Sequence, residues 1–394
     1  TKEEDTLDGW FDSGSTHFAA MKKDQGFWPA TMYLEGLDQY RGWFQSSLLT
    51  AVGAFGEGAP FKECVTHGWT VDGEGRAMHK SLGNGVDPAD IFNENGADIL
   101  RLWAASADYH ADVRCSKAIF QQLSQNYLKF RNTCKFMLDN LVDFDPTHLT
   151  KAEDMPVLDR WLITKLNELV EKVEQSYNDY EFHIITHAVN DFCVTTLSSF
   201  YLDIVKDRLY CEAADSAERR SAQTALYLTL STLAKLFAPI LAFTCDEIWL
   251  AMPHTAEDDA RNVVLNDMNK PFTTYALDAE TMARWEHIIE VRTAVNGALE
   301  EARAAKVIGK SLEADVHLTV PEGDVFLADE NPAALADLFI VSKVELAVGG
   351  ELAVKVENAA GTKCPRCWKH SLTPNAEGLC PRCAEVVRHL PDLL

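Results

Sequence analysis

The chain of 394 residues lacks several features that would restrict its function class. No apolar run approaches the roughly 18 uninterrupted residues that a membrane-spanning helix needs, although apolar residues make up 47% of the composition. No signal sequence opens the chain, because residues 1–5 (Thr-Lys-Glu-Glu-Asp) are polar and acidic. We see no internal repeat and no low-complexity segment. The missing span and signal favour a cytoplasmic protein with no membrane partner, and the length predicts two to four domains.

Positive charge is also scarce, since 36 Lys and Arg residues face 60 Asp and Glu residues and the formal net charge is −24. This balance argues against binding of nucleic acid, whose phosphates an acidic protein repels. Net charge does not describe the field of a single face, however. Between residues 361 and 394, five basic residues face three acidic ones. The C-terminal end therefore has the composition of a module that contacts phosphate, and we expect it to contact RNA.

Four of the 10 cysteines form two Cys-x-x-Cys pairs near the C-terminal end. Cys364 pairs with Cys367, and Cys380 pairs with Cys383. Four thiolates at this spacing are typical of a tetrahedral structural zinc site. A short segment with few apolar residues cannot build a core, so the metal would supply its folding energy. Two disulfides, or thiols that only lie close, are the alternatives. A reducing environment favours one zinc ion.

The residue pattern divides the chain into four parts. Residues 1–115 mix glycine, tryptophan and short apolar runs, a pattern typical of an α/β domain. Residues 116–312 carry apolar stripes at steps of three and four, which predict a helical bundle. Residues 313–360 cluster β-branched residues and predict a small α/β connector, and residues 361–394 form the cysteine tail. The predicted fold class is multidomain, with α/β and all-α parts.

Two local expectations are more specific. Pro239 should end or kink the helix that includes residues 226–237, because proline lacks an amide hydrogen and clashes with the preceding turn. Strands of the connector are expected within residues 316–320, 339–348 and 352–356.

A glycine-containing segment over residues 72–84 has the features of a phosphate-binding loop. Its glycines allow backbone amides to approach anionic oxygens, and Lys80 is a mobile point charge beside the hydroxyl of Ser81. The spacing is not that of a Walker motif, so a P-loop is not expected. A solvated, glycine-rich hairpin is the alternative.

Several segments, in matching order along the whole chain, resemble the class I aminoacyl-tRNA synthetases. Residues 72–84 resemble the KMSKS loop, and residues 10–15 (WFDSGS) resemble the signature after the editing insertion of the isoleucine, valine and leucine enzymes. Residues 33–44 (YLEGLDQYRGWF) are similar to a segment of the isoleucyl enzymes. Further matches are residues 96–103, 243–249 and 306–314 and the four-cysteine tail. Valyl and leucyl relatives generally lack this cysteine ending.

The resemblance implies the second half of a class I Rossmann-like catalytic fold, a helical anticodon-binding bundle, a small α/β connector and a C-terminal zinc ribbon. It also implies an isoleucine–tRNA ligase activity in the complete enzyme, which is expected to be a monomer. Isoleucine, ATP with magnesium, and tRNA(Ile) are the implied substrates.

The resemblance also assigns roles to residues at two places. Lys80 matches the second lysine of KMSKS and would hold the charge of the leaving pyrophosphate. The implied ATP-binding loop is Ala77, Met78, His79, Lys80 and Ser81.

The second place is the implied adenylate-binding group. Glu35 would orient an ammonium or ribose hydroxyls, and Trp43 would form an apolar wall for the branched side chain. The group consists of Glu35, Gly36, Asp38, Gln39 and Trp43. Without the resemblance, an ordinary turn and a core aromatic would explain these residues.

The chain departs from the family pattern in two ways. Ala77 replaces the first lysine of the loop and His79 its first serine, so one phosphate-binding charge is lost. No His-Ile-Gly-His element and no editing domain are present. We therefore expect a C-terminal portion that forms no adenylate by itself. A non-catalytic tRNA-binding protein derived from a synthetase, and a valyl-tRNA synthetase, are the alternatives.

Overall fold

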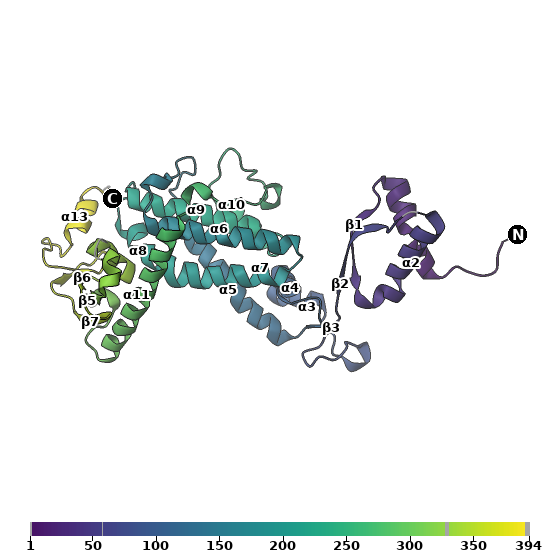
Figure 1. The fold of residues 1–394 in the computed structure, drawn as a ribbon, viewed down its shortest axis with the longest axis horizontal. Coiled ribbons are helices and arrows are strands. Elements are labelled where there is room, and N and C mark those ends of the chain that lie inside the picture. Colours follow the sequence, from purple (N-terminus) through teal and green to yellow (C-terminus); the bar gives the residue numbers. More distant parts are fainter. Residues whose placement is uncertain (1, 57, 328–330, 391–394) are drawn as a thin grey trace. The chain divides into compact units, whose positions relative to one another are not determined.

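The computed structural model describes residues 2–56, 58–327 and 331–390 (Figure 1). Contacts within the chain divide it into two compact units. The N-terminal unit comprises Thr1–Gln125 with Glu181–His183, and the C-terminal unit comprises Asn126–Tyr180 with Ile184–Leu394. Within the described ranges, no helix combines the length and apolar character that crossing a membrane requires.

The N-terminal unit contains a parallel pair of strands, β1 (Ala30–Gly36) and β2 (Phe61–His67). Parallel strands need a crossover between them, and α2 (Trp43–Leu49) with a π-helical turn at Thr50–Ala54 lies in this connection. Helix α1 (Gly9–Gly14) packs on α2. Gly36 pairs with His67, so the two strands end at the same edge.

A second parallel pair in this unit frames the predicted phosphate loop. Strand β3 (Thr70–Val71) pairs with β4 (Val113–Arg114). Between them lie the loop and two helices, α3 (Pro88–Asn95) and α4 (Ala97–Ser106). The side chain of Asp87 caps α3 by accepting a hydrogen bond from the amide of Ala89 at 2.8 Å. This cap and Pro88 at the first helical position define where the loop ends.

Long amphipathic helices make up the core of the C-terminal unit. Helix α9 is buried along almost all of its length, and α6, α8 and α10 pack on it. Helix α9 ends at Phe237, two residues before Pro239. Two helices begin in the N-terminal unit and continue into the C-terminal one, α5 (Lys117–Asp139) and α7 (Phe182–Asp191). The other long helices of the C-terminal unit are α6 (Val157–Asn178), α8 (Leu202–Cys211), α9 (Ala217–Phe237), α10 (Ala242–Ala251) and α11 (Ala279–Ala304).

A three-stranded sheet follows the helices, in the order β6-β5-β7. Strand β5 (Ala314–Val320) pairs in parallel with β6 (Lys343–Val348) and antiparallel with β7 (Ala353–Asn358). The expectation of strand from residue 339 is wrong at its start. Phe339 instead ends helix α12 (Pro332–Phe339), and Ile340 takes a left-handed conformation at φ 58° that separates helix from strand.

The cysteine tail contains little regular structure. Strands β8 (Thr362–Lys363) and β9 (His370–Ser371) form a short antiparallel pair around the first two cysteines. Helix α13 (Pro381–Arg388) begins directly after Cys380. The tail thus holds its cysteines in two turns, one within a hairpin and one at a helix start.

Candidate functional site

Asp72 organises the predicted phosphate loop. Its carboxylate accepts hydrogen bonds from the amides of Glu74 (3.0 Å) and Arg76 (2.9 Å), from the Arg76 Nε (2.9 Å) and from the Asn84 Nδ2 (2.9 Å). The hydrogen bonds from Asn84 and from the Arg76 backbone hold the pKa of Asp72 well below its usual range. Asp72 carried no predicted role, although Asp-Gly-x-Gly is a turn sequence whose aspartate bonds to its own backbone.

Asn84 closes the loop from its other end. Its Oδ1 accepts the amide hydrogen of His79 at 2.9 Å, and its Nδ2 also donates to the carbonyl of Ala77 at 3.1 Å. Lys80 begins a short 3-10 turn and is exposed, and Gly83 ends that turn at φ 61°. Hydrogen bonds of Asn84, which is itself bonded to Asp72, therefore fix the segment over residues 77–81, and the Lys80 side chain is exposed to solvent.

Four of the five residues of the predicted adenylate-binding group lie at or just beyond the end of β1. Glu35 and Gly36 end that strand, while Asp38 and Gln39 lie in the short 3-10 helix that follows. The side chains of Glu35 and Asp38 are exposed. At Gly36, a Cβ would come within 2.8 Å of the Asp38 Oδ1, so a larger residue would displace that carboxylate.

Trp43, the fifth residue, is tied to the strand end and to residues 10–15. Its amide donates to the Gln39 Oε1 at 2.9 Å, which caps the start of α2. Its ring stacks on Tyr33 with the centroids 4.3 Å apart, and its Nε1 donates to the carbonyl of Ser13 at 3.1 Å. One face of the indole is therefore occupied by Tyr33, and Gln39 serves the local fold as well.

The structure brings together the members within each group. In the described part of the chain, no hydrogen bond or ion pair joins the residues at the end of β1 to residues 77–81. The two groups share the N-terminal unit, where the chain leads from β2 directly to β3 and the loop.

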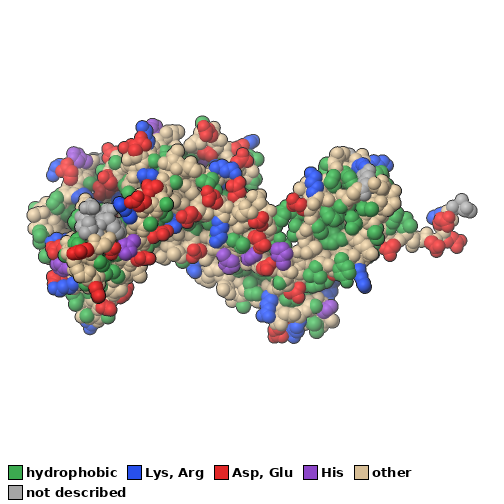
Figure 2. Space-filling model, viewed as in Figure 1, with side chains coloured by type: hydrophobic (Ala, Val, Ile, Leu, Met, Phe, Trp, Pro, Cys, Tyr) green, Lys and Arg blue, Asp and Glu red, His purple; other side chains and the backbone are tan. Residues whose placement is uncertain are grey.

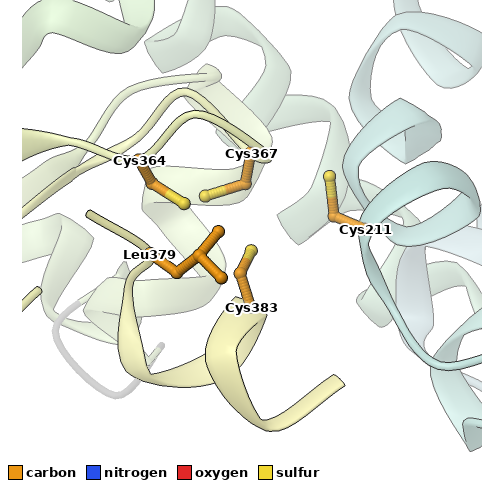
Figure 3. Packing of buried hydrophobic residues seen from close by; sticks show 5 residues of the cluster. All are labelled: Cys211, Cys364, Cys367, Leu379 and Cys383. Carbon is orange, nitrogen blue, oxygen red and sulfur yellow. The ribbon is translucent and has the colours of Figure 1, made fainter. Parts of the chain in front are cut away.

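The four tail cysteines lie close together. Figure 3 shows three of them, Cys364, Cys367 and Cys383, with their side chains near one another. The Sγ atoms of all four lie within 4.8 Å of one another, and those of Cys367 and Cys380 are 3.8 Å apart. Four sulfurs at the usual Zn–S distance of about 2.3 Å have edges of about 3.8 Å. All 10 cysteines of the chain are free thiols, so the cluster is not a pair of disulfides. Among the described residues, only this group has the composition and closeness of a metal site.

The environment of Cys364 favours the thiolate that a metal requires. Burial opposes ionisation, but hydrogen bonds from the amides of Cys367, Cys380 and Arg366 lower the pKa of the Cys364 thiol below its ordinary value. The amide of Cys380 lies 3.4 Å from the Cys364 sulfur. The donor set, its spacing and these amides fit a divalent metal ion with a preference for sulfur.

The cluster packs against α8 through contacts that the sequence pattern did not predict. Cys211, the last residue of α8, is buried beside the cluster (Figure 3). The Arg366 side chain donates to the carbonyls of Cys211 and, at 3.3 Å, Tyr210. The Arg382 Nη1 donates to Asp207 at 2.6 Å. Residues of the tail thus bind the free carbonyls and the carboxylates at the end of α8.

These contacts change the meaning of the basic tail. All five of its basic side chains have partners in the protein. Arg366 binds the carbonyls of Tyr210 and Cys211, and Arg382 binds Asp207 and Glu212. The remaining ion pairs are Lys363–Glu313, Lys369–Asp337 and Arg388–Glu385. On the face that Figure 2 shows, acidic side chains are spread over the C-terminal unit with basic ones between them. The positive charge of the tail is therefore neutralised by nearby groups of the protein. This charge alone does not support a contact with RNA.

Comparison with known proteins gives the context of these sites. Residues 1–116 match the family of tRNA synthetases class I (I, L, M and V), and residues 159–318 match the anticodon-binding domain of tRNA ligase. Isoleucine–tRNA ligases of Moorella thermoacetica and Syntrophotalea carbinolica are 47% and 48% identical over 99% and 98% of this chain. The chain spans 44% and 43% of their lengths, less than half of each.

Solved structures show the same fold at low identity. A LeuRS of Agrobacterium radiobacter K84, in a ternary complex with tRNA and LeuAMS, matches with a TM-score of 0.56 and 15% identity, over 91% of this chain and 37% of that one. The methionyl-tRNA synthetase of Mycobacterium tuberculosis matches with a TM-score of 0.51 and 19% identity, over 59% of this chain and 46% of that one. The predicted family and fold class are confirmed: the chain belongs to the isoleucine–tRNA ligase family of class I synthetases and corresponds to the C-terminal portion of its members.

Proposed function

We propose that this chain is part of an enzyme that activates isoleucine with ATP and magnesium and transfers it to tRNA(Ile). The observation that carries the proposal is the identity of 47% over 99% of the chain with an isoleucine–tRNA ligase. The four-cysteine ending favours this specificity over that of a valyl enzyme.

Lys80 is the catalytic residue of the proposal. Adenylate formation releases pyrophosphate, so negative charge develops on the leaving group and a positioned cation lowers the barrier. The exposed ammonium of Lys80 is carried on a segment that Asp72 and Asn84 hold in shape. Ala77, Met78, His79 and Ser81 complete the ATP-binding loop.

The end of β1 would bind the adenylate. Glu35 and Asp38 present exposed carboxylates that can accept hydrogen bonds from ribose hydroxyls or an ammonium group. Gly36 leaves room beside Asp38. The Gln39 Nε2 donates one hydrogen to Asp38 at 3.5 Å, and its second hydrogen can be donated to the ligand. The face of the Trp43 indole opposite Tyr33 would contact the apolar side chain of isoleucine.

The C-terminal unit would bind tRNA, with zinc as a structural metal in its tail. Cys364, Cys367, Cys380 and Cys383 would hold the ion, which supplies folding energy to the segment. Metal analysis of the purified chain tests this proposal. We expect one zinc per chain and its loss in Cys367→Ser, while Cys64→Ser, an exposed cysteine outside the cluster, should keep the ion.

Pyrophosphate exchange tests the catalytic proposal. In the full-length ligase, Lys80→Ala should slow isoleucine-dependent exchange by about 100-fold, the lower end of the effect of removing one charge-stabilising donor. Lys135→Ala, which removes an exposed lysine paired with Asp139, should leave the rate unchanged. Residues 1–394 alone should show no exchange, and measurable exchange would refute that part of the proposal.

A further inference from the structure

The predicted phosphate loop contains three side chains that can carry positive charge, and the fold uses one of them. The Arg76 Nε lies 2.9 Å from the Asp72 carboxylate, and the Arg76 Nη1 lies 3.2 Å from that of Glu74. The side chains of His79 and Lys80 are exposed, and in the part of the chain that the structure describes neither forms a hydrogen bond or an ion pair. Two adjacent basic side chains are therefore available to a ligand.

The charges of this loop cancel while His79 is neutral. Asp72 and Glu74 carry two negative charges, and Arg76 and Lys80 carry two positive ones. A loop without net charge attracts the polyphosphate of ATP less strongly than a cationic loop does. Protonation of His79 would give the loop a net charge of +1 and a second free cation beside Lys80.

The position of His79 suits it to replace the lysine that the family pattern has at Ala77. Its amide donates to the Asn84 Oδ1 at 2.9 Å, which fixes the backbone and leaves the ring unused. His79 is extended (φ −133°, ψ 140°) and directly precedes the short 3-10 turn that begins at Lys80. Consecutive residues of one fixed segment thus carry the two free basic side chains.

The charged groups around the loop leave the imidazole free. Beyond the loop, the Arg114 guanidinium of β4 lies next to Gly75, and Asp87 binds the amide of Ala89. Among the described residues, no ion pair or ring contact includes His79. A phosphate oxygen can therefore approach the ring without displacing a partner.

We propose that His79 is a further catalytic residue: its imidazole takes up a proton from solvent as ATP binds, and the imidazolium contacts a phosphate oxygen beside the Lys80 ammonium. The inference rests on the proposed function, because it needs ATP at this loop. An anion at hydrogen-bond distance favours the charged form of an imidazole, and a hydrogen bond from a charged donor to phosphate is short and strong. The proton returns to solvent when pyrophosphate leaves.

The effect of the proton has a definite sign. By reciprocity, ATP raises the proton affinity of the ring by the factor by which the proton raises the affinity for ATP. A hydrogen bond to a charged group is worth about 10-fold at its lower end. An isolated imidazole titrates near pH 6.5, so a 10-fold effect places the titration in the ATP complex near pH 7.5. The contribution of His79 should be fully present below about pH 6.5 and lost as pH rises through about 7.5.

Isoleucine-dependent pyrophosphate exchange by the full-length ligase tests this inference. The ratio of kcat/KM for ATP between the wild type and His79→Ser should be about 10 at about pH 6 and approach 1 at about pH 8.5. Ionisation of ATP itself is common to both proteins and cancels in the ratio. His79→Lys should match the wild type in acid and exceed it at about pH 8.5, because an ammonium stays charged there. His148→Ser, which removes an exposed histidine of the C-terminal unit, should follow the wild type throughout.

Calorimetry of ATP binding gives a second measurement that does not depend on the catalytic rate. With magnesium present and isoleucine absent, titrations at about pH 7 in buffers of different ionisation enthalpy should show about 0.5 proton more taken up per ATP by the wild type than by His79→Ser. The inference is overturned if the exchange ratio is the same in acid and in base, or if both proteins take up equal numbers of protons. A full-length ligase without isoleucine-dependent exchange would instead refute the proposed function.

Discussion

The ion pairs of Arg382 should determine how firmly the cysteine tail is held on α8. The guanidinium reaches both oxygens of Asp207 at 2.6 and 2.8 Å and Glu212 at 2.7 Å. The side chains of Arg382 and Asp207 are 33% and 21% exposed. Breaking a buried pair costs about 3–5 kcal/mol, and an exposed pair contributes about 0–1 kcal/mol. For this intermediate case we expect Arg382→Met to lower the free energy of unfolding by about 2–3 kcal/mol at neutral pH.

The stability that Arg382→Met loses should depend on pH in a defined direction. Burial raises the pKa of Asp207, but the hydrogen bond and charge of Arg382 outweigh it and lower the pKa below the usual value. A depressed pKa gives stability that is present above the pKa of the unfolded chain, about 3.9, and is lost as pH falls through the folded value. The difference between wild type and Arg382→Met should therefore shrink below about pH 4.

Urea unfolding followed by circular dichroism measures the change in the free energy of unfolding. Transfer of zinc to a chelator measures the rate at which the metal is released. Arg382→Met should also release zinc faster. Arg388→Met is the matched control on α13, because Arg388 is exposed and its ion pair is with Glu385 of the same helix. Its effect should stay below about 0.5 kcal/mol. An Arg382→Met protein as stable as the wild type, or a loss of equal size in the control, would refute the reasoning.

Three further predictions concern other parts of the chain. In Asn84→Ala, trypsin should cleave within residues 77–81 several-fold faster because the loop opens locally, while the free energy of unfolding changes by less than about 1 kcal/mol. An unchanged cleavage rate would show that the Asn84 hydrogen bonds do not hold the loop. Asp159→Ala leaves the buried guanidinium of Arg208 without its carboxylate, whose oxygens lie 3.0 and 3.1 Å away. It should cost about 3–5 kcal/mol in urea unfolding, and a cost below about 1 kcal/mol would count against the ion pair. Hydrogen bonds from Arg219 lower the pKa of Asp143 to about 2. Its contribution to stability should be present above about pH 4 and disappear towards pH 2, so the unfolding curves of Asp143→Asn and wild type should converge in acid; a difference independent of pH would exclude this.

Helices were the most predictable part of the fold. The apolar stripes within residues 116–312 predicted helices such as α5, and Pro239 marked the end of α9. Both signals are local, because periodicity and the missing proline amide act within a few residues. Strand onset near residue 340 was not predictable in this way. The apolar residues there belong to α12 and β6, and the left-handed residue between them has no sequence signature.

The sequence also predicted some residues of the candidate site and missed others. Motif resemblance named Lys80 and the residues at the end of β1, but not the role of Asp72. It assigned Gln39 to a ligand but did not reveal that the Gln39 Oε1 also caps α2. Hydrogen bonds of this kind depend on how a loop closes, and residue types at fixed spacing do not report that closure.

The cysteine tail shows most clearly what the sequence determined and what the tertiary structure determined. By itself, the sequence identified the four cysteines that the structure brings together, because metal coordination constrains residue type and local spacing. Only the tertiary structure decided that the basic side chains of the tail have partners within the protein and that Trp368 stays exposed. The pairs of Arg382 with Asp207 and Glu212 join residues 175 and 170 positions apart. Contacts over such separations arise from packing of whole elements, which local sequence patterns do not encode.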